Sequence, residues 1–456
     1  MKPKLVRGTR DFSALAVRKR NYLFDLLKGI FTKYGFEPLE TPAMEDLQAL
    51  TGKYGTEGDQ LLFKILNNGN YLKDIDSNAI EAGVSGALTA KLSKRALRYD
   101  LTVPFARYVA MNRNDLAFPF KRYQIQPVWR ADNPQKGRYR EFYQCDVDVI
   151  GSDSLLYEAE LCQLYDEAFA ALNLGVIIRL NNRKILEGLA QYVGQPDQFS
   201  NLTVAIDKLD KIGWDGVEQE LASLNITGQN FEKVKEVLAA PDLAAIKTLF
   251  ADIPVGLAGV EELEQVYGFL QAHSFTNTLQ LDFSLARGLS YYTGCIFEVV
   301  VDTSIPAQAT IKMGSIGGGG RYADLTGIFG FNDQSGVGVS FGAERIFDVM
   351  EQLELFQEIT PSSTTVLFLA MDDAALQYGF EALSQVRGAG IAAAIYPKAW
   401  KFQKLMKYAD KVQVPYTVLI GSKEVESGQL VFKNMTTGEQ EELSLAAIIE
   451  QLSKGQ

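Results

Sequence analysis

The spacing of hydrophobic residues changes along the chain, and each spacing predicts a different kind of element. Apolar residues recur every three to four positions over 14–34, which is typical of an amphipathic helix. From about 95 to 151 the pattern alternates and predicts extended strands. Helical spacing returns at 154–172 and, with short loops, over 182–275. Strand-like segments follow in "TLQLDFS" and "CIFEVVVD" (277–302).

The last part of the chain predicts a change of domain. A glycine-rich loop at 314–325 and a helix starting near Gly342 complete the first unit. Beyond them, "TVLFLAM", "IAAAIYP" and "YTVLIG" alternate with helical segments, which predicts a small α/β domain with a mostly parallel sheet. The predicted parts are a first domain over 1–356 with a helical insertion at about 182–275, a linker over 357–364, and a second domain over 365–456.

Composition narrows the class of protein. The chain has 456 residues, with three cysteines and one histidine, so we expect no zinc site, no disulfide framework and no resident metal. The single histidine, His273, ends a helical pattern and is expected to be structural. The first residues, "MKPKLVRGTRDF", contain no apolar segment, so we expect no signal peptide. No stretch of about 18 apolar residues is present either, and together these features predict a cytoplasmic protein without a membrane span. A net charge of −11 argues against broad non-specific binding of nucleic acid, although a local basic face is compatible with it.

Two predicted strands carry polar side chains on one face. In "FYQCDVDVIG", alternation places Phe142, Gln144, Asp146 and Asp148 on one face and apolar residues on the other. In "RYDLTVPF", the same reasoning predicts that Asp100 and Thr102 share a face. Such strands could clamp a small ligand that carries an ammonium group. A solvated sheet face is the alternative.

Three glycine- and arginine-containing stretches add candidate chemistry. The loop "VWRADNPQKGRYREF" carries Arg130 and Arg138, which suit a polyphosphate, but a solvent-exposed charged hairpin would look the same. "GSIGGGGRYADL" suits backbone that approaches a ligand closely, or a plain surface loop. "GVGVSFGAERI" predicts a strand entering a helix, with Arg345 facing a phosphate or a buried carboxylate. "LARGLSYYTG" places Arg287 beside two tyrosines, where a cation needs an anion from the protein or from a substrate.

A lysine stripe marks the second domain. In "PKAWKFQKLMKYADK", lysines spaced by three and four residues lie on one predicted helix face: Lys401, Lys404, Lys407 and Lys411. Such a stripe could bind RNA, with Trp400 or Phe402 stacking on bases, or it could be a solvated face. No P-loop is present, so any ATP is held in another way.

Taken together, these stretches resemble the histidyl-tRNA synthetases, a family of class II aminoacyl-tRNA synthetases, over essentially the whole chain. Motif 1 resembles "YGFEPLETPAMED", motif 2 "PVWRADNPQKGRYREFYQCD" and motif 3 "GVGVSFGAERI". "LARGLSYYTG", "GGGGRYADL" and "RGTRDF" are similar to signatures of the histidine enzymes. Asp132 and Tyr143 resemble the motif 2 variant of eukaryotic cytosolic members, whereas Ser290 stands where an aspartate is usual.

The resemblance implies an α/β fold: an α+β catalytic domain whose antiparallel, six-stranded-type sheet is flanked by helices, a helical insertion, and a C-terminal α/β anticodon-binding domain. It also implies a homodimer with motif 1 at the interface. The implied activity is ATP-dependent attachment of L-histidine to tRNA(His) through a histidyl-adenylate, with Mg²⁺ sharing the phosphate charge. An inactive synthetase-like regulatory subunit of ATP phosphoribosyltransferase, or another class II synthetase, is the competing interpretation.

The resemblance also implies roles for individual residues. Arg287 and Arg130 are the expected catalytic residues. Histidine is expected to contact Asp100, Thr102, Arg130, Gln144, Asp148, Arg287, Tyr291 and Tyr292. ATP is expected to contact Arg130, Arg138, Phe142 and Arg345. The expected tRNA contacts are Gln135, Lys401, Lys404 and Lys407.

Overall fold

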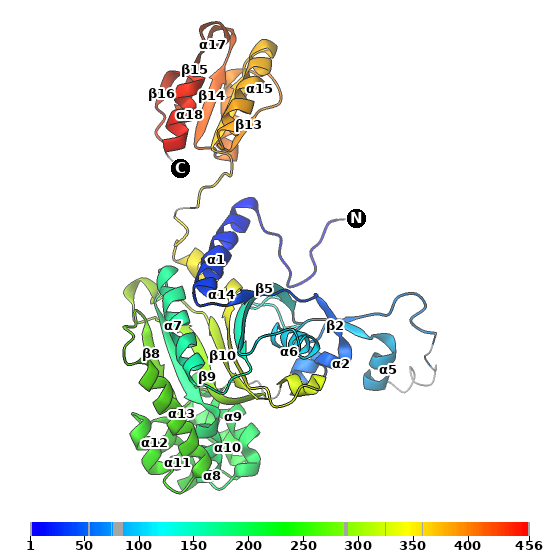
Figure 1. Ribbon diagram of the computed structural model, residues 1–456, viewed down its shortest axis with the longest axis vertical. Helices are drawn as coiled ribbons and strands as arrows, with labels where there is room; N and C mark the ends of the chain where they lie inside the picture. Colours follow the sequence, from blue (N-terminus) through cyan, green and yellow to red (C-terminus); the bar gives the residue numbers. More distant parts are fainter. Residues whose placement is uncertain are drawn as a thin grey trace. The chain divides into compact units, whose positions relative to one another are not determined.

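The chain forms two compact units in a computed structural model (Figure 1). The structure describes residues 2–52, 55–73, 75, 85–286, 291–323, 325–357 and 359–454. The first unit comprises Met1–Asp11 and Arg20–Leu355, and the second comprises Phe12–Lys19 and Phe356–Gln456. The domain boundaries given above stay a prediction.

An eight-stranded sheet is the centre of the first unit, in the order β1-β5-β6-β11-β10-β9-β7-β8. The six middle strands pair antiparallel, and β1 and β8 each add a parallel pair at an edge. The antiparallel core of the predicted fold is therefore confirmed. The strands are β1 (Glu37–Pro38), β5 (Phe120–Trp129), β6 (Glu141–Ile150), β7 (Val176–Asn182), β8 (Thr278–Leu281), β9 (Tyr292–Val301), β10 (Gly317–Tyr322) and β11 (Gly336–Gly342).

Helices α1 (Ala14–Lys33) and α7 (Leu156–Ala171) pack on this sheet by their apolar faces. Phe31 of α1 lies 5.5 Å, ring to ring, from Phe341 of β11, and Tyr165 of α7 lies 4.7 Å from the same ring. Three apolar residues of β6 that alternate along the strand are buried: Cys145, Val147 and Val149. The other face of β6 remains for polar side chains. Helix α14 (Ala343–Gln352) follows β11 directly, as predicted.

Six helices between β7 and β8 confirm the helical pattern over 182–275 and occupy the lower part of Figure 1. Glycines let them approach closely: a Cβ on Gly188 would lie 2.7 Å from the Cα of Gly256. The helices are α8 (Arg183–Tyr192), α9 (Phe199–Ile206), α10 (Leu209–Ala222), α11 (Gln229–Leu238), α12 (Leu243–Leu249) and α13 (Pro254–Leu270). Short 3₁₀ turns are η1 (Pro196–Gln198), η2 (Pro306–Gln308) and η3 (Leu325–Phe329).

The prediction of a strand around Asp100 and Thr102 is wrong, because Thr102 is the first residue of a helix, α6 (Thr102–Met111). The Oδ1 atom of Asp100 accepts a hydrogen bond from the backbone N–H of Val103 at 3.1 Å, which satisfies a donor of the first turn. Pro104 does not destabilise the helix at this position, because the backbone N–H groups of the first turn have no carbonyl partner within the helix. The two residues therefore flank a helix start. The short sheet beside it contains β2 (Met44–Asp46), β4 (Arg95–Leu97) and β3 (Lys64–Ile65), with helices α2 (Leu47–Leu50), α3 (Gly55–Gln60) and α5 (Ser85–Leu92) nearby in the chain.

The glycine run predicted as a loop is also corrected, because it forms β10 in the middle of the sheet. All of its residues are buried. A Cβ on Gly319 would lie 2.0 Å from the carbonyl oxygen of Gly338, and one on Gly320 would lie 2.7 Å from the ring of Tyr292. Glycine is required here by the closeness of the neighbouring backbone and rings, rather than by flexibility.

The second unit has a five-stranded sheet in the order β13-β12-β14-β15-β16. The strands β13, β12 and β14 are parallel, as predicted, but β15 and β16 pair antiparallel, so the sheet is mixed. The elements are β12 (Val366–Ala370), α15 (Asp373–Gly388), β13 (Ala393–Ile395), α16 (Phe402–Val412), β14 (Tyr416–Ile420), α17 (Ser422–Ser427), β15 (Gln429–Asn434), β16 (Gln440–Ser444) and α18 (Leu445–Lys454). No helix among the described residues of either unit has the length and apolar character needed to cross a membrane.

Candidate active site

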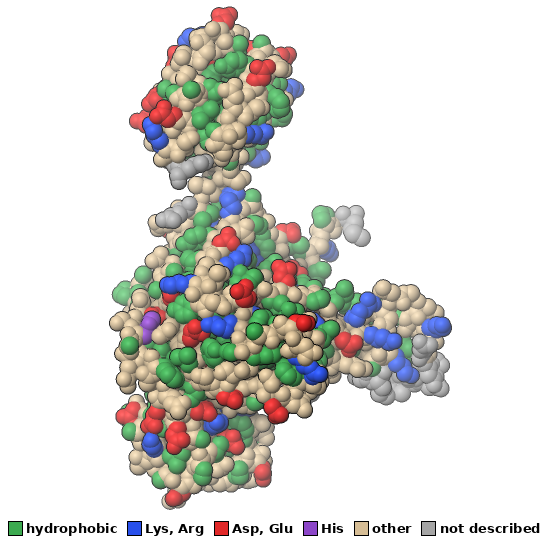
Figure 2. Space-filling view, viewed as in Figure 1, with side chains coloured by type: hydrophobic (Ala, Val, Ile, Leu, Met, Phe, Trp, Pro, Cys, Tyr) green, Lys and Arg blue, Asp and Glu red, His purple; other side chains and the backbone are tan. Residues whose placement is uncertain are grey.

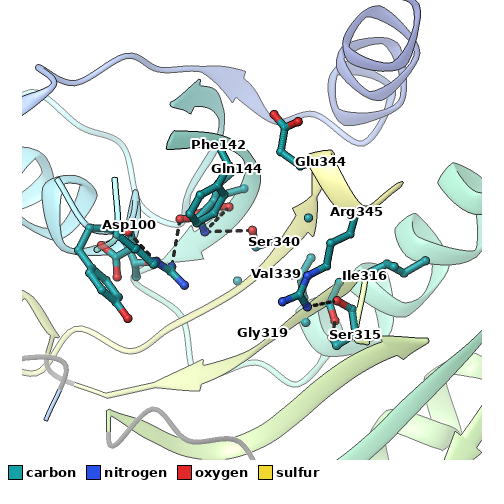
Figure 3. A pocket seen from close by; sticks show the side chains of 18 of the residues that line it. Asp100, Phe142, Gln144, Ser315, Ile316, Gly319, Val339, Ser340, Glu344 and Arg345 are labelled. Carbon is teal, nitrogen blue, oxygen red and sulfur yellow. Dashed lines mark hydrogen bonds between the residues drawn. The ribbon is translucent and has the colours of Figure 1, made fainter. Parts of the chain in front are cut away.

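A cavity of about 550 Å³ opens over β6, β10 and β11 of the first unit (Figure 3). Ten of the residues expected to contact histidine or ATP line it: Asp100, Thr102, Arg130, Arg138, Phe142, Gln144, Asp148, Tyr291, Tyr292 and Arg345. Arg287 and Ser290 lie outside the described residues. Gln135 is exposed on the loop after β5 and does not line the cavity.

Strand β6 contributes one complete polar face, as alternation predicted. Phe142, Gln144, Asp146 and Asp148 all line the cavity. The side chain of Gln144 donates to Ser340 Oγ at 3.2 Å, as Figure 3 shows, and its Nε2 lies 3.4 Å from Asp146 Oδ1. This face becomes steadily more buried along the strand, so its two aspartates stand at the enclosed end.

Arg130, at the start of the loop between β5 and β6, is held in a fixed orientation. Its Nε donates to the carbonyl oxygen of Tyr99 at 3.0 Å, and its Nη2 donates to Gln144 Oε1 at 3.4 Å. The guanidinium lies 4.2 Å from the ring centre of Tyr99 and 5.2 Å from that of Phe142. Contacts with aromatic faces orient a guanidinium without neutralising its charge.

Glu344 and Arg345, neighbours in the first turn of α14, point in opposite directions (Figure 3). The guanidinium of Arg345 donates to the carbonyl oxygens of Gly137, at 2.9 Å, and Ser315. Glu344 forms ion pairs with Arg20 of α1, at 2.7 Å, and with Arg10. The loop, the segment before β10 and the amino-terminal segment therefore meet around the start of α14.

The loop is fastened a second time through Tyr139. Its hydroxyl donates to Asp348 Oδ2 at 2.8 Å, and the guanidinium of Arg10 lies 3.4 Å from its ring centre. Burial, with the hydrogen bond to Asp348, raises the pKa of Tyr139 to about 12. The phenol therefore stays protonated and keeps donating at neutral pH.

The enclosed end of the cavity contains a buried ionic cluster that the sequence analysis did not anticipate. Arg122 of β5, whose side chain is 0% exposed, donates from Nη2 to Asp148 Oδ2 at 2.8 Å. The hydroxyl of Tyr322, on β10, donates to Asp148 Oδ1 at 2.9 Å. Arg122 stands directly opposite Asp148 in the β5–β6 register, but only a correct register could have predicted that pair. Tyr322 closes the glycine run, which had been predicted as a loop.

Burial dominates the electrostatics at this end. It raises the pKa of Asp148, against the opposing effects of Arg122 and the Tyr322 hydroxyl. It raises the pKa of Asp146 to about 7, where Arg122 and a hydrogen bond from Ser340 lower it and the charges of Asp148 and Asp100 raise it further. Two adjacent carboxylates with one buried arginine favour a ligand that brings hydrogen-bond donors or positive charge.

The remaining reactive residues lie elsewhere. His273 Nε2 is 3.3 Å from Asp166 Oδ2, outside the cavity, and burial raises the pKa of Cys145 well above its usual range. Over the part of the chain that is described, no group of three or more His, Cys, Asp or Glu side chains is placed to hold a metal ion.

The lysine stripe of the second unit has the two faces that its spacing predicted. On α16, Leu405 and Ala409 are fully buried, whereas the lysines are exposed: Lys401, Lys404, Lys407 and Lys411. Lys404 Nζ lies 4.6 Å from the ring centre of the half-buried Trp400, and Phe402 is 47% exposed.

Charged side chains also gather on other parts of the surface. Basic side chains gather around α5, at the right of Figure 2, and acidic side chains gather over the helices at the bottom of the view. On the face that Figure 2 shows, charged side chains are therefore unevenly distributed.

Comparison with known families agrees with this arrangement of two units. A family model described as histidyl-tRNA synthetase matches residues 88–346, and one described as an anticodon binding domain matches residues 362–455. The chain is 48% identical to the histidine–tRNA ligase of Bacteroides fragilis over 458 aligned positions, covering 99% of each protein. It is 47% identical to that of Cytophaga hutchinsonii, again over 99% of each.

Solved structures resemble the chain at lower sequence identity. The crystal structure of histidyl-tRNA synthetase from a Nostoc species aligns with a TM-score of 0.82 and 30% identity over 100% of both chains. A Bacillus halodurans protein, titled as an ATP phosphoribosyltransferase regulatory subunit/histidyl-tRNA synthetase, aligns with a TM-score of 0.70 at 20% identity over 92% of this chain and 99% of its own. At that identity the likeness concerns the fold alone.

Proposed function

The chain belongs to the histidyl-tRNA synthetase family, and from this premise we propose that its cavity binds histidine at the enclosed, acidic end and ATP at the outer, arginine-lined end. The chain is an enzyme that attaches L-histidine to tRNA in an ATP-dependent reaction, as its near-full-length relatives are named for doing. The observation that carries the subsite proposal is the polar face of β6, which leads from Phe142 to Asp148.

The chemistry explains why such a site needs no general base. In the first step, a carboxylate oxygen of histidine bonds to the α-phosphorus of ATP, and pyrophosphate leaves with the electrons of the broken P–O bond. In the second step, a terminal ribose hydroxyl of tRNA attacks the acyl carbon, the bond from that carbon to the phosphate oxygen breaks, and AMP leaves as the hydroxyl proton passes to the departing phosphate or to water. The first nucleophile is already an anion, so catalysis consists mainly of positioning and charge stabilisation.

We propose that the histidine ammonium lies among Asp100, Thr102 and Gln144. The imidazole then reaches Asp148 with one ring N–H, and a hydroxyl from Tyr291 or Tyr292 meets the other ring nitrogen. Support comes from the lining of the cavity by all of these side chains. A polar partner for each ring nitrogen discriminates strongly against amino acids that lack them.

For ATP, we propose that Arg130 and Arg287 stabilise the α-phosphate and the histidine carboxylate as charge builds between them. Arg138 and Arg345 would bind the outer phosphates, and Phe142 would stack on adenine. The fixed orientation of Arg130 supports its role, because a preorganised guanidinium loses little freedom in the transition state. The role of Arg287 rests on the family resemblance.

Mg²⁺, in this proposal, arrives with the phosphates of ATP. Magnesium is commonly bound by one or two carboxylates together with substrate phosphates. Asp132, which lines the cavity beside Arg138, is a carboxylate within the outer part of the site. Asp132 would help to hold the ion, and the ion would neutralise negative charge on the leaving pyrophosphate.

For the tRNA, we propose one set of contacts in each of the two units. Gln135, exposed on the loop that borders the cavity, would meet the acceptor end. The exposed lysines of α16 would meet the anticodon region: Lys401, Lys404 and Lys407. The match of residues 362–455 to an anticodon-binding model supports the second contact.

We further propose a cytoplasmic homodimer, in line with the family resemblance. In the motif 1 segment, Met44 of β2 is 52% exposed, and Met111 at the end of α6 is 71% exposed. Exposed apolar side chains of this kind suit a subunit interface. Sedimentation of the purified protein would reveal a single species of twice the chain mass, and a monomer at micromolar concentration would contradict the proposal.

Amino-acid-dependent exchange between ATP and pyrophosphate, followed by tRNA charging, tests the function. Histidine should be the one amino acid among the twenty that supports both. A regulatory-subunit role would predict neither activity, and it is not better supported, given the ligase relatives and the anticodon-binding match. Exchange with another amino acid would refute the subsite assignment, and absence of exchange with all twenty would refute the proposed function.

A further inference from the structure

Arg122 does not line the cavity, but it is the buried partner of the cavity residue Asp148, and the proposed roles do not use it. Its side chain is 0% exposed, on the middle of β5. Burying a guanidinium is costly, and in this case its Nε has no hydrogen-bond partner among the described residues. Stability alone is a poor reason to keep such a group, because an apolar residue of similar size commonly serves as well.

The contacts of Arg122 join two parts of the amino-acid subsite. Its Nη2 donates to Asp148 Oδ2 at 2.8 Å and lies 3.3 Å from the carbonyl oxygen of Leu101, the residue between Asp100 and Thr102. Its Nη1 lies 3.3 Å from the carbonyl oxygen of Asp146. The guanidinium is 4.4 Å from the ring centre of Phe105, which fixes its plane.

The sheet register explains how Asp148 can lean into this position. Asp148 pairs with Arg122 on one side and with Gly338 on the other. A Cβ on Gly338 would lie 2.0 Å from Asp148 Oδ1, so the carboxylate occupies the space of the missing side chain. Gly336 likewise leaves room for the ring of Tyr322, whose hydroxyl completes the grip on Asp148.

We propose that Arg122 is a positioning residue of the amino-acid subsite, which holds the Asp148 carboxylate and the Asp100–Thr102 segment at the separation that bound histidine requires. The inference rests on the proposed function, because it assumes that histidine binds between these groups. Arg122 acts through them and does not touch the substrate. Tyr322 has the same role toward the second carboxylate oxygen of Asp148.

The test measures histidine- and ATP-dependent kinetics of pyrophosphate exchange for Arg122→Met, Arg122→Lys and Tyr322→Phe. Arg122→Met should raise the KM for histidine about tenfold or more and change the KM for ATP by less than about twofold, and Arg122→Lys should recover part of the loss. Tyr322→Phe should raise the histidine KM by a smaller factor. Lys121→Met is the matched control: Lys121 neighbours Arg122 on β5 but pairs with Glu160, at 2.7 Å, away from the cavity.

A double-mutant cycle separates positioning from a general structural role. In an Asp148→Asn background, Arg122→Met should change the histidine KM by less than about threefold, because its main partner is already altered. An unchanged histidine KM in Arg122→Met, equal increases for histidine and ATP, or full additivity with Asp148→Asn would overturn the inference. If Arg122→Met does not fold, unchanged histidine KM values in both Arg122→Lys and Tyr322→Phe would overturn it. Absence of histidine-dependent exchange in the unaltered enzyme would instead refute the proposed function.

Discussion

Replacing Asp148 with alanine should weaken both the fold and histidine binding, and the structure separates the two effects. The sequence alone predicts that this change leaves the fold largely intact. The structure contradicts that expectation, because Asp148 is the carboxylate partner of a fully buried arginine. Its side chain is 4% exposed, and it also accepts the hydrogen bond from Tyr322.

The size of each effect follows from these contacts. Removing one partner of a buried ion pair leaves an uncompensated charge and costs about 3–5 kcal/mol. Loss of the acceptor for a substrate N–H costs roughly 2–4 kcal/mol more in binding, equivalent to a rise of about 30- to 1,000-fold in the KM for histidine. Asp148→Asn keeps one acceptor oxygen and the side-chain volume, so it should be less destabilising than alanine.

Denaturant unfolding of the free enzyme and histidine-dependent exchange measure the two effects separately. The first unit should unfold at clearly lower denaturant in Asp148→Ala than in the unaltered enzyme, with Asp148→Asn between them. A change in unfolding free energy of less than about 1 kcal/mol for alanine would refute the reasoning, since Arg122 could then not depend on this carboxylate. A normal KM for histidine would remove Asp148 from the binding site.

Three further changes test other parts of the enzyme. Burial raises the pKa of Asp146 to about 7, so the folded chain keeps a proton that the unfolded chain loses near pH 4. The stability should therefore fall as the pH rises from about 4 to 7, and Asp146→Asn should make the thermal midpoint fall less steeply over this range. The same pH dependence of the midpoint in both proteins would contradict the raised pKa. Arg287→Ala should slow adenylate formation by about 10²–10³-fold and slow transfer to tRNA much less, and single-turnover rates that fall equally for both steps would make Arg287 a structural charge. Deletion of residues 365–456 should leave pyrophosphate exchange measurable and abolish most tRNA charging, because every residue that lines the cavity precedes residue 346. If the shortened protein folds but loses both activities, the two domains do not act independently.

The sequence predicts the elements whose pattern is set locally. Alternation along β6 predicted the face that lines the cavity. The small residues of "GVGVSFGAERI" and the helical pattern after them predicted the turn from β11 into α14. Motif spacing also indicated the loop between β5 and β6. Each of these features depends on residues that are neighbours in the sequence, so the local pattern is enough to predict it.

The features that the sequence did not predict depend on contacts between distant strands. The glycine run looks like a loop until its neighbours are known, because only the approach of Gly338 and Tyr292 explains why side chains are absent. Thr102 looks like a strand residue until the hydrogen bond from the Val103 N–H to Asp100 shows that a helix begins there. Arg122 looks like an ordinary strand cation, and its importance follows only from its register with Asp148.

The order of strands in the large sheet has a consequence for synthesis on the ribosome. The cavity lies where β6 pairs with β11, yet residues 151–335 separate these two strands in the chain. While that stretch is being made, the helices from α8 to α13 can pack by their own local contacts, but the inner edge of β6 has no partner strand. An unpaired strand edge can bind other chains, and pairings between distant segments form slowly. We therefore expect the nascent catalytic unit to be most prone to aggregation just before β11 emerges, and ribosome pauses that occur before β11 has emerged to lower the yield of soluble enzyme more than pauses near the end of the chain.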